Sequence, residues 1–275
     1  MTIAKKIGSS GDVLATVSQI VTQITGVQLG DKQRAMVETR LKRRMHELKI
    51  KTEEQYLKYV QDNAQSETQA LISLLTTHHS YFFREFAHFE YLERHALPEV
   101  IRAARERGDK KIRVWSAACS RGQEVYSLSM FLAHHLRRLA PDCTYEVWGS
   151  DVDKESVALA NNGVYLRNEI KEVPLLYLEN HWARGTGDIA EYVKAKKTIK
   201  DQTKFFVANL LDFSKELNGQ KFDVVFCRNV FIYFTADQVK KITSNLLNHV
   251  HTHGYFFIGI SESLYGMSLP VQSMG

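Results

Sequence analysis

The stretch IRVWSAACSRGQEVYSLSM (residues 112–130) passes from an apolar run through a turn of small residues into a helical pattern. Ile112, Val114 and Trp115 favour a buried strand, and the small residues that follow let a ligand lie close to the backbone. A helix that begins just after Gly122 points its N-terminal amides, and the positive end of its dipole, at that turn. The stretch therefore predicts a strand–turn–helix unit that can hold a ligand, although such turns also occur as plain connections in α/β folds.

Length and composition limit the class of protein. With 275 residues, of which 44% are hydrophobic and 24% charged, the chain can form one large or two unequal globular domains with a sizeable core. It has no run of about 18 apolar residues, and the N-terminal MTIAKKIGSSGDV lacks the apolar segment of a signal peptide. We therefore expect a cytoplasmic protein without membrane insertion.

The cysteines and histidines give no sign of a metal site. The cysteines are Cys119, Cys143 and Cys227. They are too few and too far apart for a disulfide framework or a CxxC zinc site, so reduced thiols are expected. The segment HVHTH (residues 249–253) alternates three histidines, but no neighbouring carboxylate or cysteine completes a site. The sequence favours a solvated loop there and no metal.

Residues 1–95 show helical periodicity and no convincing strand, which predicts an all-helical N-terminal domain with its linker. The periodicity is interrupted at Gly26, at Gly30 and in the polar stretch 62–66. Two pairs fit capping boxes that open new helices: Thr52 with Gln55, and Ser66 with Gln69. A connecting helix is expected over residues 86–109.

From Lys110 onward, short apolar runs alternate with helical segments, which predicts a mainly parallel α/β sheet. The expected strands are residues 112–116, 145–150, 204–208, 222–227 and 255–260. The polar residues at their ends are Ser116, Asp151 with Asp153, Asn209 with Asp212, Arg228 with Asn229, and Ser261 with Glu262. Because the carboxyl ends of parallel strands line one edge of an open sheet, these side chains should face a common ligand crevice.

Asp151 directly follows the second expected strand. In nucleoside-binding α/β folds an acidic residue at this place accepts the ribose hydroxyls, although an aspartate there can also be a helix N-cap. The upstream turn carries one glycine instead of the GxGxxG pattern, which disfavours a dinucleotide with a pyrophosphate. A nucleoside with a small non-phosphate group fits better, and S-adenosylmethionine is the common one.

Seven ordered segments resemble the chemotaxis receptor methyltransferase family (CheR type), and the resemblance spans nearly the whole chain. The segments are TTHHSYFFREFAHF (76–89), WSAACSRGQEVYSLSM (115–130), GSDVD (149–153), RGTG (184–187), NLLDF (209–213), FCRNVFIYF (226–234) and IGISESL (258–264). The resemblance implies an α/β fold: a Rossmann-like S-adenosylmethionine-dependent methyltransferase domain (96–275) with a small antiparallel β insertion (165–203), after the helical domain (1–95). It also implies transfer of methyl groups to glutamate side chains of chemoreceptors in bacterial chemotaxis, with S-adenosylhomocysteine as the product.

Carried over position by position, the resemblance assigns Arg84 and Tyr233 to the catalytic centre. The planar guanidinium of Arg84 can hold a carboxylate of the substrate or of the cofactor, and Tyr233 can hydrogen-bond the attacking or departing group. Because a glutamate is already ionised at neutral pH, the transfer needs alignment and not a strong base. Without the family resemblance, the residues alone also allow Arg84 to form a surface ion pair and Tyr233 to be a core residue.

The implied cofactor contacts are His78, Ser80, Arg84, Ala118, Glu124, Asp151, Asn209, Leu210, Asn229 and Val230. By resemblance, Glu124 meets the methionine amino group and Asp151 the ribose. Asn209 and Leu210 lie near the adenine, and Asn229 and Val230 flank the methionyl part. His78 stands where the family usually has Asn, and its hydrogen bonding depends on tautomer and pH. Ser80 stands where the family has Thr and keeps the hydroxyl.

The substrate side is expected on two segments. Eight Lys or Arg residues between Lys32 and Lys51 make one basic helix, and a solvated face, nucleic acid or a glutamate-rich receptor helix could each explain it. The resemblance favours receptor docking by a monomer that does not bind nucleic acid. The residues concerned are Arg40, Arg43 and Arg44 on this helix, and Arg184, Gly185, Gly187 and Lys194 in the insertion. In some family members the insertion grips a short receptor tail by strand addition. Lys194 stands where a second Arg is expected, so it keeps the charge without the planar fork.

Two other functions stay open from the residues. A nucleic-acid methyltransferase would suit the net charge of +5, but no Asp/Asn-Pro-Pro-aromatic turn follows the fourth strand. A receptor-binding adaptor that lost the cofactor through His78 is the second. The chain also stops at Gly275, where the family usually adds a hairpin, so either the chain is shortened or that sheet edge is missing.

Overall fold

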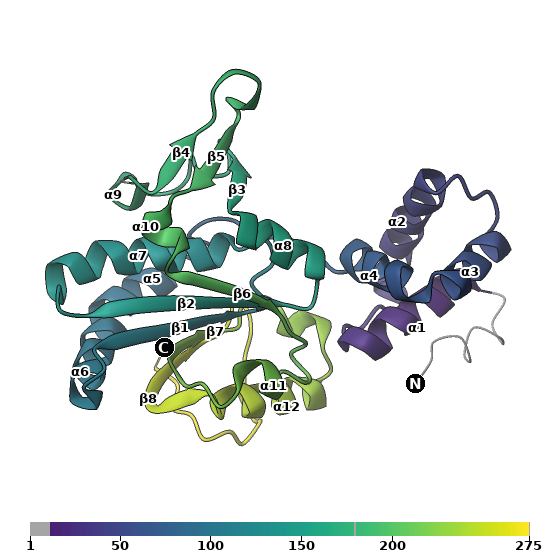
Figure 1. Ribbon diagram of the computed structural model, residues 1–275. Helices are drawn as coiled ribbons and strands as arrows, with labels where there is room; N and C mark the ends of the chain where they lie inside the picture. The colour runs from purple at the N-terminus through teal and green to yellow at the C-terminus, as the bar shows by residue number, and fades with distance from the viewer. Residues whose placement is uncertain (1–11, 179, 275) are drawn as a thin grey trace.

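The computed structural model describes residues 12–178 and 180–274 as two lobes joined by a linker (Figure 1). The smaller lobe is helical, and the larger one is built on a parallel sheet from which a small antiparallel sheet stands out. The prediction of an α/β fold with a helical N-terminal unit and an antiparallel insertion is confirmed. No helix in the described ranges is long and apolar enough to cross a membrane.

The helices of the smaller lobe begin and end mostly where the sequence marks them. In the described part they are α1 (Val13–Thr25), the 3₁₀ turn η2 (Asp31–Gln33), α2 (Arg34–Glu47), α3 (Glu53–Asp62) and α4 (Ala64–Leu75). Gly26 ends α1 with a left-handed φ of 82°, and Thr52 caps α3 by accepting the N–H of Gln55. The helix start expected at Ser66 is wrong. α4 begins earlier, and the Ser66 hydroxyl donates to the carbonyl of Asn63 instead of accepting an amide.

A charged group lies in the core of the helical lobe. Glu67 of α4 is 1% exposed, and its carboxylate accepts two N–H groups of Arg44 from α2, at 3.0 and 2.6 Å. The hydroxyl of Tyr56 from α3 donates to the same carboxylate at 2.6 Å. Because a buried carboxylate is tolerated only when it is paired and hydrogen-bonded, Arg44 joins α2 to α4 inside this lobe.

The larger lobe contains a five-stranded parallel sheet in the order β6-β2-β1-β7-β8. The strands are β1 (Lys111–Ala117), β2 (Thr144–Asp151), β6 (Thr203–Val207), β7 (Phe222–Phe226) and β8 (Val250–Phe257). The helical elements beside them are α5 (Ala87–Tyr91), the π-helical η3 (Leu92–Ala96), α6 (Leu97–Arg107), α7 (Gln123–Leu139), α8 (Lys154–Asn162), α11 (Ser214–Leu217), the 3₁₀ turn η5 (Phe231–Tyr233) and α12 (Ala236–Leu247). The chain runs from β1 through β2 to β6 and then returns to the other side of β1. The point where the strand order reverses therefore lies between β1 and β7, where α/β sheets bind their ligands.

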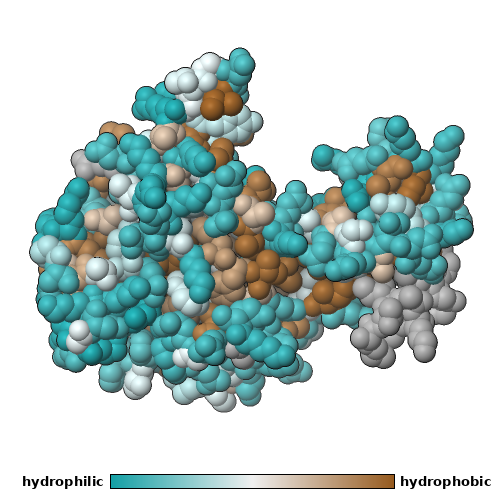
Figure 2. Space-filling model, in the orientation of Figure 1, coloured by the Kyte–Doolittle hydropathy of each residue, from teal (hydrophilic) through white to brown (hydrophobic). Residues whose placement is uncertain are grey.

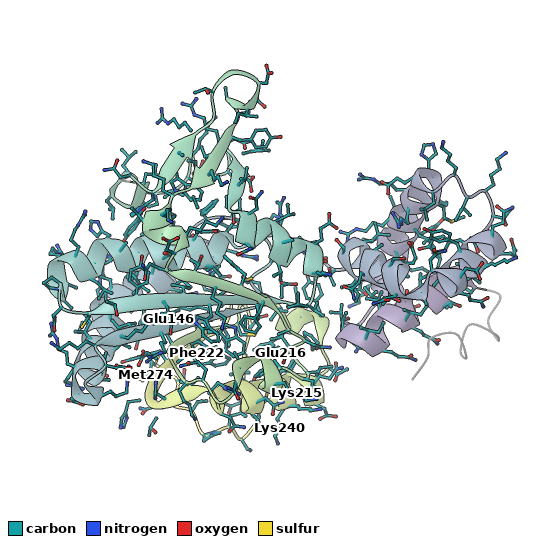
Figure 3. The ribbon with its side chains drawn as sticks, viewed as in Figure 1. Glu146, Lys215, Glu216, Phe222, Lys240 and Met274 are labelled. Atoms are coloured by element: carbon teal, nitrogen blue, oxygen red, sulfur yellow. The ribbon has the colours of Figure 1, made fainter. Side chains whose placement is uncertain are left out.

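Helices cover both faces of the parallel sheet (Figure 1). One apolar core lies under α5, α6 and α7 and includes Phe131, and the other lies under α11 and α12 and includes Trp115 and Phe222. Figure 3 labels Phe222 inside this lobe and the exposed Lys215 and Lys240 on the outer helices α11 and α12. The alternation of side chains along β1 thus serves two cores at once.

The last strand starts earlier than the sequence indicates. The strand expected at residues 255–260 is in fact β8, which begins at Val250, so residues 250–253 belong to the strand and the solvated loop expected there is wrong. A Cβ at Gly254 would lie 2.8 Å from the carbonyl oxygen of Asp223 on β7, and the pairing of the two strands shifts in register nearby. This close approach interrupts the apolar run and hides the first half of the strand from a pattern-based prediction.

The antiparallel sheet is inserted between α8 and β6. Its elements are β3 (Val164–Leu166), α9 (Leu175–Leu178), β4 (Trp182–Arg184), η4 (Gly187–Ile189), β5 (Tyr192–Ala195) and α10 (Lys197–Lys200), with the strand order β3-β5-β4. Phe82 of the linker meets the rings of Tyr165 and Trp182 edge-on, with centroids 5.1 and 5.5 Å away. Phe83 stacks on Tyr177 at 4.7 Å. The base of the insertion therefore holds the linker between the lobes.

Replacing Arg44 by alanine is expected to lower the free energy of unfolding by about 3 kcal/mol, because Glu67 would keep a buried charge without its ion-pair partner. Chemical denaturation followed by circular dichroism measures the change. The matched control is Arg43→Ala, since the exposed Arg43 pairs with Glu47 one turn away on the surface and should cost less than about 0.5 kcal/mol. Equal losses in the two variants would contradict the role given to the buried pair.

Candidate functional site

A pocket lies where the carboxyl ends of four parallel strands meet the helical lobe. One wall comes from the loops after β1, β2, β6 and β7, and the other from the residues after α1 and the linker after α4. In Figure 2, hydrophobic residues gather on the side of the larger lobe that faces the helical lobe. The pocket is lined by His78, Ser80, Arg84, Ala118, Glu124, Asp151, Asn209, Leu210, Asn229, Val230 and Tyr233. The structure thus brings together every position that the sequence assigns to the cofactor and to catalysis.

The turn after β1 is bent by left-handed backbone at Ala118 (φ 65°), Ser120 (φ 52°) and Gly122 (φ 88°). Only glycine adopts this conformation without cost, so the other two residues must be held by their surroundings. One such contact is the N–H of Ser120, which donates to Asp151 at 2.8 Å. The end of β2 therefore holds the turn in place, and α7 begins directly behind it.

Asp151 is buried at the end of β2, and each of its oxygens accepts one backbone N–H, from Ser120 at 2.8 Å and from Asp153 at 3.0 Å. Burial raises the pKa of Asp151, against the opposing effect of these two hydrogen bonds. Since a carboxylate oxygen can accept more than one hydrogen bond, both oxygens can still accept a hydroxyl. The helix N-cap is Asp153, which accepts the N–H groups of Glu155 and Ser156 at the start of α8. The alternative reading of Asp151 as the cap is thereby excluded.

A buried arginine lines the same pocket. Arg228 follows β7, has 2% of its side chain exposed, and donates to Glu124 of α7 at 2.7 Å. It also donates to Nδ1 of His88 at 2.8 Å and to the backbone carbonyl of Arg84 at 2.8 Å, and it lies 3.4 Å from Glu85. One guanidinium therefore joins the linker, α5, α7 and the loop after β7.

The charge of Arg228 shifts the pKa of two neighbours. Burial lowers the pKa of His88 and Arg228 lowers it further, so the ring is neutral at physiological pH and its Nδ1 accepts the hydrogen bond. Burial raises the pKa of Glu85, but a hydrogen bond from Asn229 and the charge of Arg228 outweigh it, and the pKa lies below its usual range. The cluster thus holds an ionised carboxylate and a neutral imidazole beside one cation.

The loop after β7 is held from two sides. Asn229 has a φ of 56°, its side-chain amide donates to Glu85 at 2.8 Å, and its backbone N–H donates to Glu262 at 2.9 Å. Glu262, in the segment after β8, also accepts the N–H groups of Phe231 and Gly259, both at 2.8 Å. The fifth strand therefore contributes to the site by fixing this loop, while the other four strands supply lining residues.

His78 lines the pocket, but both of its ring nitrogens have partners elsewhere. Nε2 lies 3.1 Å from the carbonyl of Ser73 and 3.0 Å from the hydroxyl of Thr76 at the end of α4. Nδ1 lies 3.1 Å from the hydroxyl of Ser156 on α8. The ring joins the two lobes, which is a different role from the cofactor contact that the resemblance implies.

Arg84 lies in a turn between Phe83 (φ 53°) and Glu85 (φ 54°). Its guanidinium donates to the carbonyl of His79 at 2.8 Å and lies 5.7 Å from the centre of the Tyr81 ring. No further hydrogen bond of this side chain is found within the described ranges, and a guanidinium has five donors. Arg84 can therefore bind a carboxylate in the pocket without leaving its place.

The polar and charged groups of the pocket fit a nucleoside that carries an amino-acid tail. Asp151 can accept two hydroxyls, and the buried hydroxyl of Ser120 has no hydrogen-bond partner among the described residues. Glu124 and Arg84 offer opposite charges for an amino and a carboxylate group. Apolar side chains from both lobes offer a surface for a flat base: Val27, Leu29, Met36, Leu75, Leu210 and Phe234.

The basic helix α2 separates into inward and outward residues. Arg40 donates to the carbonyls of Leu74 and Thr76 at 2.6 and 2.9 Å and so caps the end of α4, while Arg44 pairs with the buried Glu67. Both side chains thus have partners inside the helical lobe. Of the three arginines expected to meet the receptor, Arg43 is the one whose side chain is largely exposed, at 80%.

The residues expected in the insertion lie along its edge. Arg184 ends β4, which is an edge strand, Gly185 and Gly187 follow it, and Lys194 lies on β5. A Cβ at Gly185 would lie 1.9 Å from the carbonyl oxygen of Ile189, so this turn requires glycine. The lining of a second pocket beside them includes four cations, one carboxylate and a tryptophan: Arg167, Lys171, Arg184, Lys196, Glu191 and Trp182.

Glu85 and His88 help to organise the site and were not predicted there, whereas Arg228 and Glu262 were expected at the crevice only as polar residues at strand ends, without a role. Arg228 was visible as a charged residue at the end of a strand. Glu85 and His88 lie inside the FFRE segment, next to Arg84, and a search of that segment for partners of Arg228 could have found them. Nothing in the sequence marks Glu262 as the acceptor of three backbone N–H groups.

Comparisons with known proteins show which families and proteins this chain is similar to. A family model described as the CheR methyltransferase all-alpha domain matches residues 12–76, and one described as the CheR methyltransferase SAM-binding domain matches residues 78–275. The chain is 36% identical to a chemotaxis protein methyltransferase of Escherichia coli, over 90% of this chain and 82% of that protein. It is 35% identical to the Salmonella typhimurium protein of that name, over the same shares, and 30% identical to chemotaxis protein methyltransferase 2 of Pseudomonas aeruginosa, over 92% and 87%.

The stability of the protein is expected to fall as the pH is lowered from 7.5 to 5.5. The pKa of His88 is lowered by burial and by Arg228, so below about 6.5 the unfolded chain binds a proton that the folded chain does not. The pKa values of His135 and His251 are also lowered, first by burial, and add to the loss. His88→Asn keeps an acceptor for Arg228 without titrating, so its denaturation midpoint should vary less with pH. The same pH dependence in both proteins would refute the assignment.

Proposed function

Since this chain belongs to the CheR methyltransferase family, we propose that it transfers a methyl group from S-adenosylmethionine to glutamate side chains of chemoreceptors. Methyl transfer from this cofactor in chemotaxis follows from the family, and the glutamate acceptor is the proposed part. The proposal rests chiefly on one observation: Arg84 and Tyr233 line the same pocket as Asp151 and Glu124. We place the reaction in the cytoplasm, on receptor helices, and expect the protein to act as a monomer.

The cofactor is proposed to lie along the edge of the parallel sheet. S-adenosylmethionine, when bound, supplies a methyl group on a positively charged sulfur. Asp151 accepts the two ribose hydroxyls, with the buried Ser120 hydroxyl beside it. The adenine lies near Asn209 and Leu210 and against the apolar side chains of the helical lobe. The methionyl part lies along Ala118, Glu124, Asn229 and Val230, with His78 and Ser80 of the linker at the pocket wall.

Glu124 is proposed to accept the amino group of the methionyl part. One of its oxygens accepts the hydroxyl of Ser116 at 2.7 Å, and the other accepts Arg228 at 2.7 Å. A carboxylate has about four acceptor sites, so a further donor can be added. The two existing hydrogen bonds fix the orientation of the carboxylate before the ligand arrives, which lowers the cost of binding.

Arg84 and Tyr233 are proposed to align the acceptor. A glutamate carboxylate is ionised at neutral pH and is already a nucleophile, so no residue has to remove a proton. What the site must supply is a short approach along the line of the breaking bond. The unused donors of Arg84 hold a carboxylate through the planar fork, and the hydroxyl of Tyr233 hydrogen-bonds the acceptor oxygen.

Two surfaces are proposed to hold the receptor. On α2, the side chains of Lys42 and Arg43 are 73% and 80% exposed and present positive charge to a glutamate-rich helix. On the insertion, the edge strand β4 offers unpaired backbone groups beside the cations of the second pocket, which suits strand addition by a receptor tail. Arg40 and Arg44 act from inside the helical lobe, by holding α2 in position.

Incubation with labelled S-adenosylmethionine and chemoreceptor-containing membranes is expected to place base-labile label on the receptor. Arg84→Ala and Tyr233→Phe should each lower kcat/KM by about 100-fold, because alignment of the acceptor is lost. Arg94→Ala, an exposed arginine on η3, is the matched control and should label as the wild type does. Equal labelling by Arg84→Ala would remove its proposed role, and label that resists base would exclude a glutamate ester.

Docking of the receptor on α2 is expected to depend on the exposed side chains of Lys42 and Arg43. Reversing Lys42 and Arg43 to glutamate should raise KM for the receptor by about tenfold without changing the affinity for S-adenosylhomocysteine. The control reverses Lys215 and Lys240, which lie on α11 and α12, far from α2 (Figure 3). Arg184→Ala should raise KM only for receptors that carry a tail. An unchanged KM in all three variants would exclude both docking surfaces.

A further inference from the structure

Residues around the end of α1 join the helical lobe to the loops after β6 and β7. We infer that this segment, the α1 clamp (Ile24, Gly26 and Gln28), is a positioning element that fixes Tyr233 at the pocket. The inference rests on the proposed function, since it takes Tyr233 as the residue that aligns the acceptor. Three sets of contacts carry it: to the loop after β6, to the turn η5 and to the start of α12.

The first contact is made by Asn209 in the loop after β6. Its amide nitrogen donates to the carbonyl of Ile24 at 2.6 Å, and its amide oxygen accepts the N–H of Leu211 at 2.9 Å. The last carbonyls of a helix have no partner within the helix, so Asn209 satisfies one of those of α1. Its hydrogen-bonding groups therefore tie the end of α1 to the loop that lines the pocket.

The second contact is to Tyr233 itself. The backbone N–H of Gln28 donates to the carbonyl oxygen of Tyr233 at 2.8 Å. The start of the same turn is held by Glu262, which accepts the N–H of Phe231 at 2.8 Å. The turn η5 is thus held at its start by the larger lobe and at its end by the helical lobe, and Tyr233 lies at the end that the helical lobe holds.

The third contact is made by the side chain of Gln28, which donates two hydrogen bonds. Its amide nitrogen donates to the carbonyl of Gly26 at 2.8 Å and to the amide oxygen of Gln238 at 3.2 Å. Gln238 in turn donates to the carbonyl of Gly26 at 3.3 Å and accepts the N–H of Thr235, within the capping box that opens α12. Since Thr235 is two residues after Tyr233, the capping of α12 and the clamp hold the same short stretch of chain.

Gly26 allows the two lobes to come this close. Its φ is 82°, and a Cβ there would lie 2.3 Å from the Leu211 side chain and 3.0 Å from the ring of Phe234. Leu211 belongs to the Asn209 loop, and Phe234 follows Tyr233 directly. Any larger residue at position 26 would have to displace the Leu211 side chain and would be strained by the left-handed backbone.

The test uses Gln28→Ala in the full-length protein, with Gln23→Ala, an exposed glutamine on α1, as the matched control. Gln28→Ala should lower kcat by about tenfold while KM for the receptor stays within about twofold, because a displaced aligning group affects the chemical step more than docking. Backbone amides of residues 229–235 should exchange hydrogen faster, while those of β1 and β2 keep their rates. Gly26→Ala should give a larger effect of the same kind.

A second experiment, in the Tyr233→Phe variant, distinguishes the positioning of Tyr233 from a general loosening of the protein. In Tyr233→Phe, adding Gln28→Ala should cause no further loss of kcat, because the hydroxyl that the clamp positions is already gone. Unchanged exchange in residues 229–235, unchanged kcat, or an equal loss in the two backgrounds would overturn the inference. If the wild type itself does not methylate receptors, the proposed function fails, and the exchange rates of Gln28→Ala still decide whether the clamp holds the turn.

Discussion

The buried guanidinium of Arg228 is the contact on which the arrangement of the site depends. Burying a charge costs on the order of several kcal/mol unless the charge is paired and hydrogen-bonded. Arg228 meets this requirement through Glu124, Glu85 and His88, which come from α7, the linker and α5. The need for pairing therefore fixes three segments relative to β7. It also places Arg84 at the pocket, because the carbonyl of Arg84 accepts a hydrogen bond from the same group.

Strained backbone occurs in the linker and in the loops around this cluster. Left-handed φ values occur at Phe83, Glu85, Ala118, Ser120 and Asn229, in the linker and in two of the loops that line the pocket. Each such residue costs on the order of 1 kcal/mol or more, so it persists only where its neighbours hold it. Here the neighbours are the ring contacts of Phe83, the Arg228 cluster and the carboxylates of Asp151 and Glu262. A site already shaped in this way loses little freedom when a ligand binds, which favours tight and specific binding.

Much of the fold could be predicted because local patterns encode it. The strand and turn of residues 112–122, the acid after β2 and the caps at Gly26 and Thr52 are each decided by neighbouring residues. The start of β8 was missed because it depends on how closely two strands approach, which no local pattern records. The inward role of Arg44 was missed for the same kind of reason, since its partner comes from another helix. Charge density along α2 shows that the helix is basic, but packing decides which of its charges face outward.

Some of the residues that line the pocket also join the two lobes. His78 and Asn209, which the resemblance places at the cofactor, use their hydrogen-bonding groups to join the two lobes. The pocket has one wall with Asp151 and another with Val27 and Leu29, so both walls exist together only when the lobes are docked. A ligand that touches both walls therefore favours the docked arrangement, and a change that lowers the population of the docked arrangement weakens the binding of that ligand. This reciprocity couples ligand binding at the pocket to the docking of the helical lobe.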